Sequence, residues 1–194
     1  MANEPMASMA EREADAQRTN AAAAAKAAPG RPSAGPGSAA KLGLAIGSDR
    51  LLVDLSEAGE IVPLPSMILA VPLTRDWLLG VTNLRGSLHT VADLRRFALG
   101  QFTDAGKEAR VLALAEGLEF NVTLVVSKML GLRNTASMKP LEGGMPASAG
   151  ADSLVGCTRP WLGQVHVVAE GHYWRELSLA RLAEDHEFLL IGRH

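Results

Sequence analysis

The chain has 194 residues, a length that suits one ordinary domain or two small ones. Its 19 Lys and Arg residues are almost balanced by 21 Asp and Glu residues, so it lacks the basic excess typical of nucleic-acid-binding proteins. The single cysteine, Cys157, has no partner for an internal disulfide, and the longest strongly apolar run, residues 67–73, is too short to span a bilayer. We therefore expect a cytoplasmic protein that binds no nucleic acid and does not insert directly into the membrane.

The composition changes sharply at about residue 40. Residues 1–40 contain no Leu, Ile, Val, Phe, Trp or Tyr, and they include an alanine run at residues 21–25. Three prolines interleaved with glycines follow that run: Pro29, Pro32 and Pro36. Such a segment buries too little apolar surface to offset the entropy of ordering it. The sequence predicts a disordered tail and flexible linker over residues 1–40 and a folded region over residues 41–192.

Short apolar runs separated by turn residues follow from residue 41 to about residue 100, a pattern typical of β-strands. Strands are expected at residues 42–46, 51–55, 81–84 and 88–94, with irregular chain or a further strand within residues 56–64. Thr74 is a suitable N-cap for one helical turn over residues 74–78. Arg85-Gly86 predicts a tight turn between two of the strands.

A second set of strands is expected after residue 108. The expected strands are residues 111–115, 118–126, 153–158, 164–168 and 174–177. The first two form a hairpin through Glu116-Gly117. Residues 134–151 are rich in glycine and proline and predict a looser region. A short amphipathic helix is expected around Leu179 and Leu182.

The two sets of strands show a weak internal repeat. Residues 78–82 (Leu-Leu-Gly-Val-Thr) are echoed by residues 154–158 (Leu-Val-Gly-Cys-Thr). Many short strands punctuated by turns favour barrels or sandwiches, and the repeated order predicts two small barrels. The repeat also aligns Cys157 with Val81, which predicts a small buried side chain at Cys157.

The sequence shows no set of residues that suits catalysis. None of the five histidines lies in a metal-ligand spacing: His89, His166, His172, His186 and His194. Neither a glycine-rich phosphate loop nor a serine nucleophile elbow is present. We therefore expect a non-enzymatic binding protein without cofactor or metal. The alternatives are an enzyme centred on Cys157 and a small β-barrel adaptor of unrelated partners.

Arg85 is the clearest candidate for recognition, because it stands at a tight bend between two apolar strands. An exposed guanidinium offers a planar set of donors to a carboxylate or carbonyl group of a partner. In the alternative interpretation Arg85 pairs inside the protein, for instance with Asp93, and only supports the turn.

The residues around this turn resemble the signature block of the CheW coupling family. The matching residues are Gly80-Val81-Thr82-Asn83-Leu84-Arg85-Gly86 and Asp93-Leu94, with Val71-Pro72 and Asp76-Trp77 upstream. The resemblance covers residues 41–192. Residues 86–91 (Gly-Ser-Leu-His-Thr-Val), residues 174–177 (Trp-Arg-Glu-Leu) and Phe188-Leu189 resemble the type IV pilus branch of that family. Flagellar members commonly carry a proline at the position of Thr90 and a larger aliphatic residue at that of Ala92.

The resemblance implies a mainly β fold with two SH3-like five-stranded barrels and short helices, one within about residues 41–100 and one within about residues 108–192. It also implies an adaptor between the cytoplasmic tip of a methyl-accepting chemoreceptor and the regulatory domain of a CheA-like histidine kinase. The implied output is twitching motility, with a flagellar or other chemosensory array as the alternative, and the implied location is the membrane-associated receptor array. The family's partner-binding residues fall on Arg85, Asn83, Glu60 and Ala58.

Overall fold

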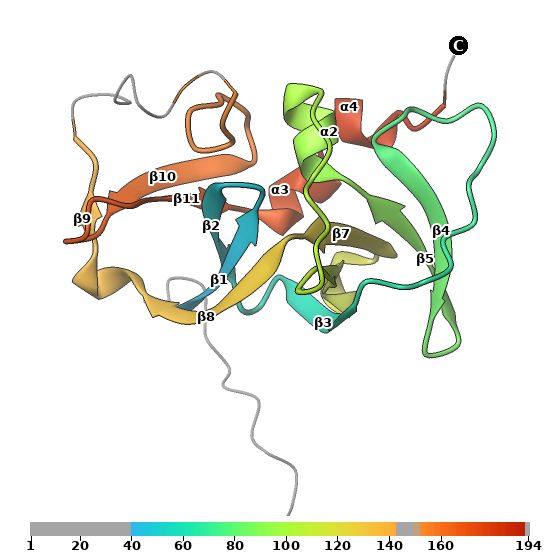
Figure 1. Cartoon of the computed structure of the whole chain (residues 1–194), viewed down its shortest axis with the longest axis horizontal. Coiled ribbons are helices and arrows are strands. Elements are labelled where there is room, and N and C mark those ends of the chain that lie inside the picture. Colours follow the sequence, from blue (N-terminus) through green and yellow to red (C-terminus); the bar gives the residue numbers. More distant parts are fainter. Residues whose placement is uncertain (1–39, 143–149, 151, 193–194) are drawn as a thin grey trace, which may run out of the picture. The chain divides into compact units, whose positions relative to one another are not determined.

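The computed structural model describes residues 40–142, 150 and 152–192, and strands predominate in this part of the chain, as predicted (Figure 1). These strands form two sheets, A and B, and short helices follow β5 and β11. The expected tail over residues 1–40 lies outside the described residues except for Ala40, which begins the first strand.

Sheet A has six strands in the order β8-β1-β2-β11-β10-β9. Their bounds are β1 Ala40–Ile46, β2 Asp49–Asp54, β8 Lys128–Asn134, β9 Lys139–Pro140, β10 Leu162–Val167 and β11 Tyr173–Leu177. β1 and β2 form an antiparallel hairpin, and β11 lies parallel to β2.

Sheet B has five strands, the number expected of each barrel, in the order β3-β6-β7-β5-β4. Their bounds are β3 Ala58–Pro63, β4 Leu78–Leu84, β5 Ser87–Ala92, β6 Arg110–Leu114 and β7 Val122–Val126. The hairpin of β4 and β5 was predicted, as was the antiparallel pair of β6 and β7.

The sheets do not follow the two halves of the sequence, and this corrects the expected boundaries of the barrels. β1 and β2, which were expected in the first barrel, pair with β8 and β11 from the second half of the chain. β6 and β7 pair instead with β3 and β5. The physical reason is burial, because apolar side chains of β1 and β2 such as Leu44 and Leu51 pack with Leu177 of β11.

The strand expected at residues 153–158 is also absent, and turns occupy these positions. Ser153 organises them, since its carbonyl oxygen accepts from Gly156 N (3.1 Å) and Cys157 N (2.9 Å). The buried carboxylate of Asp49 accepts from Leu154 N at 2.9 Å and binds the Ser153 hydroxyl. Cys157 is half-buried and packs against the main core. It lies outside any strand, so the match to Val81 of β4 was wrong.

In the part of the chain that the structure describes, three short α-helices accompany the sheets: α2 Leu94–Leu99, α3 Leu179–Ala183 and α4 His186–Leu189. The same residues include two 3-10 turns, η1 Glu116–Leu118 and η2 Thr135–Ser137. Asp93 caps α2 by accepting from Arg96 N at 3.0 Å. The helical turn expected after Thr74 does not form. Thr74 instead makes an isolated bridge with Gly192, and its hydroxyl donates to Val71 O at 2.8 Å.

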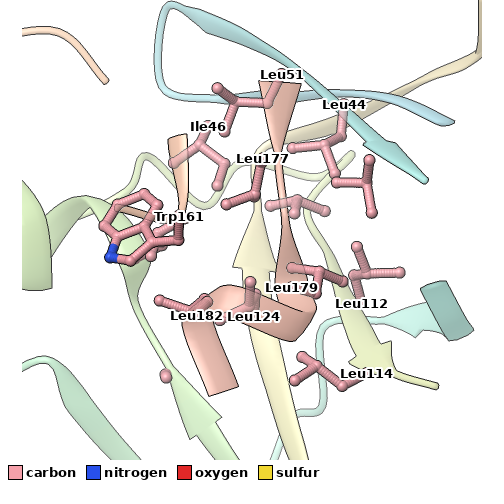
Figure 2. Packing of buried hydrophobic residues seen from close by; sticks show 14 of the residues in the cluster. Leu44, Ile46, Leu51, Leu112, Leu114, Leu124, Trp161, Leu177, Leu179 and Leu182 are labelled. Carbon is pink, nitrogen blue, oxygen red and sulfur yellow. The ribbon is translucent and has the colours of Figure 1, made fainter. Parts of the chain in front are cut away.

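The main hydrophobic core draws residues from both sheets and from the helices (Figure 2). Leu44, Leu112 and Leu177 illustrate this mixture, because they come from β1, β6 and β11. Each sheet also has a small cluster of its own. Leu52, Met138 and Trp174 form the cluster of sheet A, and Val91, Val111 and Val125 form that of sheet B.

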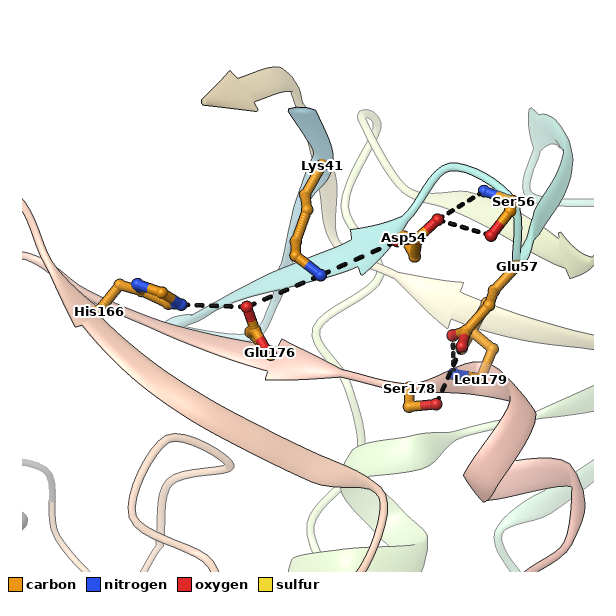
Figure 3. A network of polar contacts seen from close by, with 8 residues as sticks. All are labelled: Lys41, Asp54, Ser56, Glu57, His166, Glu176, Ser178 and Leu179. Carbon is orange, nitrogen blue, oxygen red and sulfur yellow. Dashed lines mark hydrogen bonds and ion pairs between the residues drawn. The ribbon is translucent and has the colours of Figure 1, made fainter. Parts of the chain in front are cut away.

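Polar contacts fix the segment that carries the chain from β2 in sheet A to β3 in sheet B (Figure 3). Asp54 Oδ1, at the end of β2, accepts from Ser56 N at 2.9 Å. The Glu57 carboxylate accepts from Ser178 Oγ (3.0 Å) and Leu179 N (2.6 Å) at the start of α3. Glu57 O also accepts from Ala115 N at 2.9 Å, just after β6. One residue thereby connects the start of sheet B with the helix that follows sheet A.

Candidate partner-binding surface

The tip of the β4–β5 hairpin is a two-residue turn made by Arg85 and Gly86. Leu84 pairs with Ser87, and the turn residues have φ angles of 48° and 92°. Positive φ at both central positions is the geometry that matches the twist of a two-residue hairpin. Gly86 adopts it without cost, whereas Arg85 occupies a region that side chains other than glycine rarely enter.

Asn83 holds this turn closed. Its Oδ1 accepts a hydrogen bond from Gly86 N at 2.7 Å, while the Asn83 side chain itself is exposed. Asparagine suits the position because its short amide reaches the backbone of a following residue. Asn83 thus positions Arg85 and leaves its own NH2 group on the surface.

Arg85 pairs with Glu60. The distance from Arg85 Nε to Glu60 Oε1 is 2.7 Å, and the two side chains are 81% and 31% exposed. Asp93, the internal partner considered from the sequence, is instead buried and accepts from Thr103 N at 2.8 Å and from Thr103 Oγ1 at 2.7 Å. The guanidinium of Arg85 therefore has an internal partner on one side and faces solvent with most of its surface.

The pair also shows that sheet B curls on itself. Glu60 lies on β3 and Arg85 follows β4, and these are the two edge strands of the five. Side chains from both edges, Val62 of β3 and Leu84 of β4, pack against the same small cluster inside the sheet. Opposite edges that meet in this way give the barrel-like form predicted from the sequence.

A β-bulge sets the direction of the Glu60 side chain. Ala58 pairs with Leu114 and Ile61 pairs with Leu112, so β3 carries one extra residue across this interval. A Cβ atom at Gly59 would lie 2.5 Å from Leu114 O, so the bulge needs glycine there. Ala58 and Glu60 consequently do not share a face. Ala58 packs against the main core, whereas Glu60 meets Arg85.

The structure therefore brings together three of the four residues that the sequence pointed to. Arg85, Asn83 and Glu60 belong to one surface, and Ala58 lies apart from it at a half-buried position. Sequence reasoning missed an apolar neighbour, Leu88, which pairs across the hairpin with Asn83 and is 63% exposed. No sequence signal separates such a residue from the buried leucines of other strands.

The described residues contain no cluster of His, Cys, Asp or Glu that could hold a metal ion. In the same part of the chain, no helix is long and apolar enough to cross a membrane. Cys157 lies near Arg159, whose pKa is raised chiefly by its hydrogen bond to Glu187. The surface at Arg85 offers a cation and an apolar side chain, which suits the binding of another protein surface.

Comparison with known proteins identifies the family of this chain. The family model described as "CheW-like domain" matches residues 42–185. The chain belongs to the CheW-like domain family. Its structure is also similar to that of the scaffolding protein TtCheW from Thermoanaerobacter tengcongensis. The TM-score is 0.58 at 16% sequence identity, over 79% of this chain and 98% of that one. A search of the curated proteins found no match.

The CheW-like assignment confirms the resemblance noted in the sequence at the level of the family, and the similarity to TtCheW confirms the fold class. Both sheets lie within the matched region except for the first two residues of β1. The CheW-like domain therefore includes the hairpin of Arg85, the bulge of Glu60 and the core between the sheets.

Proposed function

We propose that this CheW-like protein is a non-enzymatic adaptor that joins a methyl-accepting chemoreceptor to a CheA-like histidine kinase. The cytoplasmic tip of the receptor binds at the Arg85 turn, and the regulatory domain of the kinase binds elsewhere on the domain. The adaptor works from the cytoplasm and is recruited to membrane-associated receptor arrays. Membership in the CheW-like family and the exposed Arg85 turn support this proposal.

The observation that carries the proposal is the conformation of Arg85. A residue with a long side chain at φ 48° raises the energy of the folded chain, and Gly at this position would avoid that cost. The contact with Glu60 offsets little of this conformational energy, because exposed ion pairs contribute about 0–1 kcal/mol to stability. Binding of a partner to the guanidinium would explain why Arg85 is both strained and exposed.

The arrangement suggests how binding is made specific. Arg85 presents a fork of N–H donors to a carboxylate or carbonyl group, and Glu60 restrains the side chain from one side. The exposed Leu88 on the same hairpin adds an apolar contact. Signal transfer through such an adaptor requires only that its contacts differ in free energy between kinase-on and kinase-off arrays.

We further propose that the output is type IV pilus motility rather than flagellar motility. Thr90 supports this choice, because its N–H donates to Asn121 O at 2.9 Å. A proline, common at this position in flagellar members, has no N–H to donate. Ala92 is fully buried at the end of β5, so a larger aliphatic residue would need a rearranged core.

Titration calorimetry with the receptor's cytoplasmic fragment and with the kinase regulatory domain tests the proposal. Arg85→Ala should weaken receptor binding at least about tenfold, which corresponds to about 1.4 kcal/mol. Arg75→Ala is the matched control, since it removes the same charge from another exposed position of the described chain. Equal receptor affinity for the Arg85→Ala and wild-type proteins would contradict the assignment of the site. Binding of neither partner by the wild-type protein would contradict the adaptor role itself.

A further inference from the structure

A hollow of about 380 Å³ lies at one end of sheet A, whereas the Arg85 turn belongs to sheet B. Residues from three places line it: the turn between β1 and β2, the turn between β10 and β11, and the turns at residues 153–156. The starts of β2 and β11 lie side by side here, because the two strands run parallel with Arg175 opposite Leu51. A hollow of this size suits a small polar ligand.

Hydrogen bonds hold the walls of the hollow in place. Asp49 is 4% exposed, and its carboxylate accepts from Leu154 N at 2.9 Å and from Ser153 Oγ at 2.5 Å. In the turn between β10 and β11, Val168 N donates to His172 O at 3.2 Å. The hollow is therefore shaped by turns that are fixed in the folded chain.

The negative charge near the hollow is either engaged or exposed to solvent. Among the described residues that line it, Asp49 is the one carboxylate, and both of its oxygens already accept hydrogen bonds. Asp152 and Glu170 adjoin the lining turns in the sequence, but both are exposed and neither lines the hollow. Solvent and salt screen exposed charges of this kind, so they oppose an anion only weakly.

Four of the lining side chains carry hydrogen-bond donors: Ser48, Arg50, His172 and Tyr173. Among the residues that the structure describes, none of these four side chains makes a hydrogen bond or an ion pair. Arg50 is nevertheless held in place, because it is half-buried and its Cζ atom lies 5.8 Å from the centroid of the Trp174 ring. Such a contact restrains a guanidinium while its N–H donors stay available to an anion.

A second guanidinium lies behind the wall. Arg175 Nη1 donates to the carbonyl oxygen of Val155, a lining residue, at 3.2 Å. Arg50 and Arg175 therefore place two positive charges at the hollow against the single engaged carboxylate of Asp49. This balance favours an anion over a cation, and the described residues hold no cluster suited to a metal ion.

We propose that the hollow binds a phosphate group, either as the free ion or as a small phosphate monoester. A guanidinium presents a planar set of donors that matches phosphate oxygens, and hydroxyl and imidazole groups add single donors. These donors come from two separate turns, so they suit the several oxygens of a tetrahedral anion better than the two oxygens of a planar carboxylate. The site adds a small ligand to the protein partners of the adaptor.

Titration of the full chain with inorganic phosphate at constant ionic strength, followed by amide NMR, tests the site. The wild-type protein should bind phosphate saturably, with the largest shift changes at Ser48, Arg50 and His172. Arg50→Ala should raise the dissociation constant at least about tenfold, because it removes the charged donors. Arg133→Ala is the matched control, since Arg133 Cζ lies 5.2 Å from the same Trp174 ring although Arg133 does not line the hollow.

Further measurements separate binding from folding and identify the source of the phosphate. Arg50→Lys keeps the charge without the planar set of donors and should weaken binding less than Arg50→Ala. Phosphate should raise the unfolding temperature of the wild-type protein but not that of Arg50→Ala. Binding of O-phosphoserine that equals or exceeds that of inorganic phosphate would indicate a monoester, and weaker binding would indicate the free ion.

A folded wild-type protein that shows no saturable binding would overturn the proposal. Equal affinity of the wild-type protein and Arg50→Ala, or equal weakening by Arg133→Ala, would indicate an adventitious ion only and would overturn it as well. None of these outcomes depends on whether the adaptor binds a receptor or kinase.

Discussion

The Nε atom of Arg85 lies 2.7 Å from Oε1 of Glu60, although the two residues belong to opposite edges of sheet B. The contact exists because the sheet curls until β3 approaches the tip of the β4–β5 hairpin. A bulge at Gly59 turns Glu60 toward that tip, and Asn83 closes the turn that presents Arg85. The candidate site is therefore a product of curvature, bulge and turn acting together.

Replacing Arg85 with glycine should separate stability from binding. Glycine relieves the positive φ of 48°, and the lost ion pair is largely exposed, so unfolding free energy should rise by about 0.5–1 kcal/mol. Receptor affinity should fall as far as in Arg85→Ala. Urea unfolding together with calorimetry checks both parts. A clear loss of stability in Arg85→Gly would mean that the guanidinium mainly supports the fold.

Replacing Asn83 with alanine should loosen the turn. The variant loses the acceptor for Gly86 N, a bond of 2.7 Å, and should lose about 0.5–1.5 kcal/mol of unfolding free energy. Asn83→Asp keeps an oxygen at this position and should keep most of that stability. Hydrogen exchange at Gly86 gives the local measurement. Equal protection of this amide in the two variants would show that the Asn83 side chain does not hold the turn.

Replacing Glu57 with alanine should weaken the connection between the sheets. The carboxylate accepts from Ser178 Oγ and Leu179 N at the start of α3, and its loss leaves the N–H of the buried residue Leu179 without this acceptor. We expect a decrease of about 1–3 kcal/mol in unfolding free energy, with a smaller decrease for Glu57→Gln. Glu108→Ala is the control, because the Glu108–Lys128 pair is exposed and should contribute less than about 1 kcal/mol. Equal effects of Glu57→Ala and Glu108→Ala would argue against this connection.

Replacing Thr90 with proline tests the local basis of the pilus assignment. Proline removes the N–H that donates to Asn121 O at 2.9 Å, so Thr90→Pro should cost about 1 kcal/mol or more in unfolding free energy. Thr90→Val retains the N–H and the branched side chain and should change stability much less. Thermal unfolding of the two variants distinguishes these results. Free tolerance of proline would remove the structural reason for distinguishing this chain from flagellar members.

The sequence indicated where most strands lie, because their alternating or apolar runs and intervening turn residues are local signals. It did not indicate β8, most of whose side chains are exposed and so give no alternating pattern. Nor did it indicate that β1 and β2 pair with β8 and β11, because pairing depends on which distant apolar faces meet. The internal repeat predicted neither which strands pair nor the turns at residues 153–158.

The candidate site was predictable where the motif was local. The Asn83 to Gly86 turn is contained in four consecutive residues, whereas the contact between Arg85 and Glu60 requires the curvature of the whole sheet. Residues 67–73 were recognised only as the longest apolar run. Sequence alone gave no indication that Met67, Leu69 and Leu73 would remain on the surface.

Receptor control of the kinase, reconstituted with and without this chain, tests the central claim most directly. The rate of kinase autophosphorylation is measured with receptor-containing membranes, kinase and either the wild-type protein or Arg85→Ala. The adaptor role predicts that the receptor changes this rate only when the wild-type chain is present, and that Arg85→Ala largely abolishes the change. Receptor control that is equally strong without the chain, or with Arg85→Ala in its place, would contradict the account.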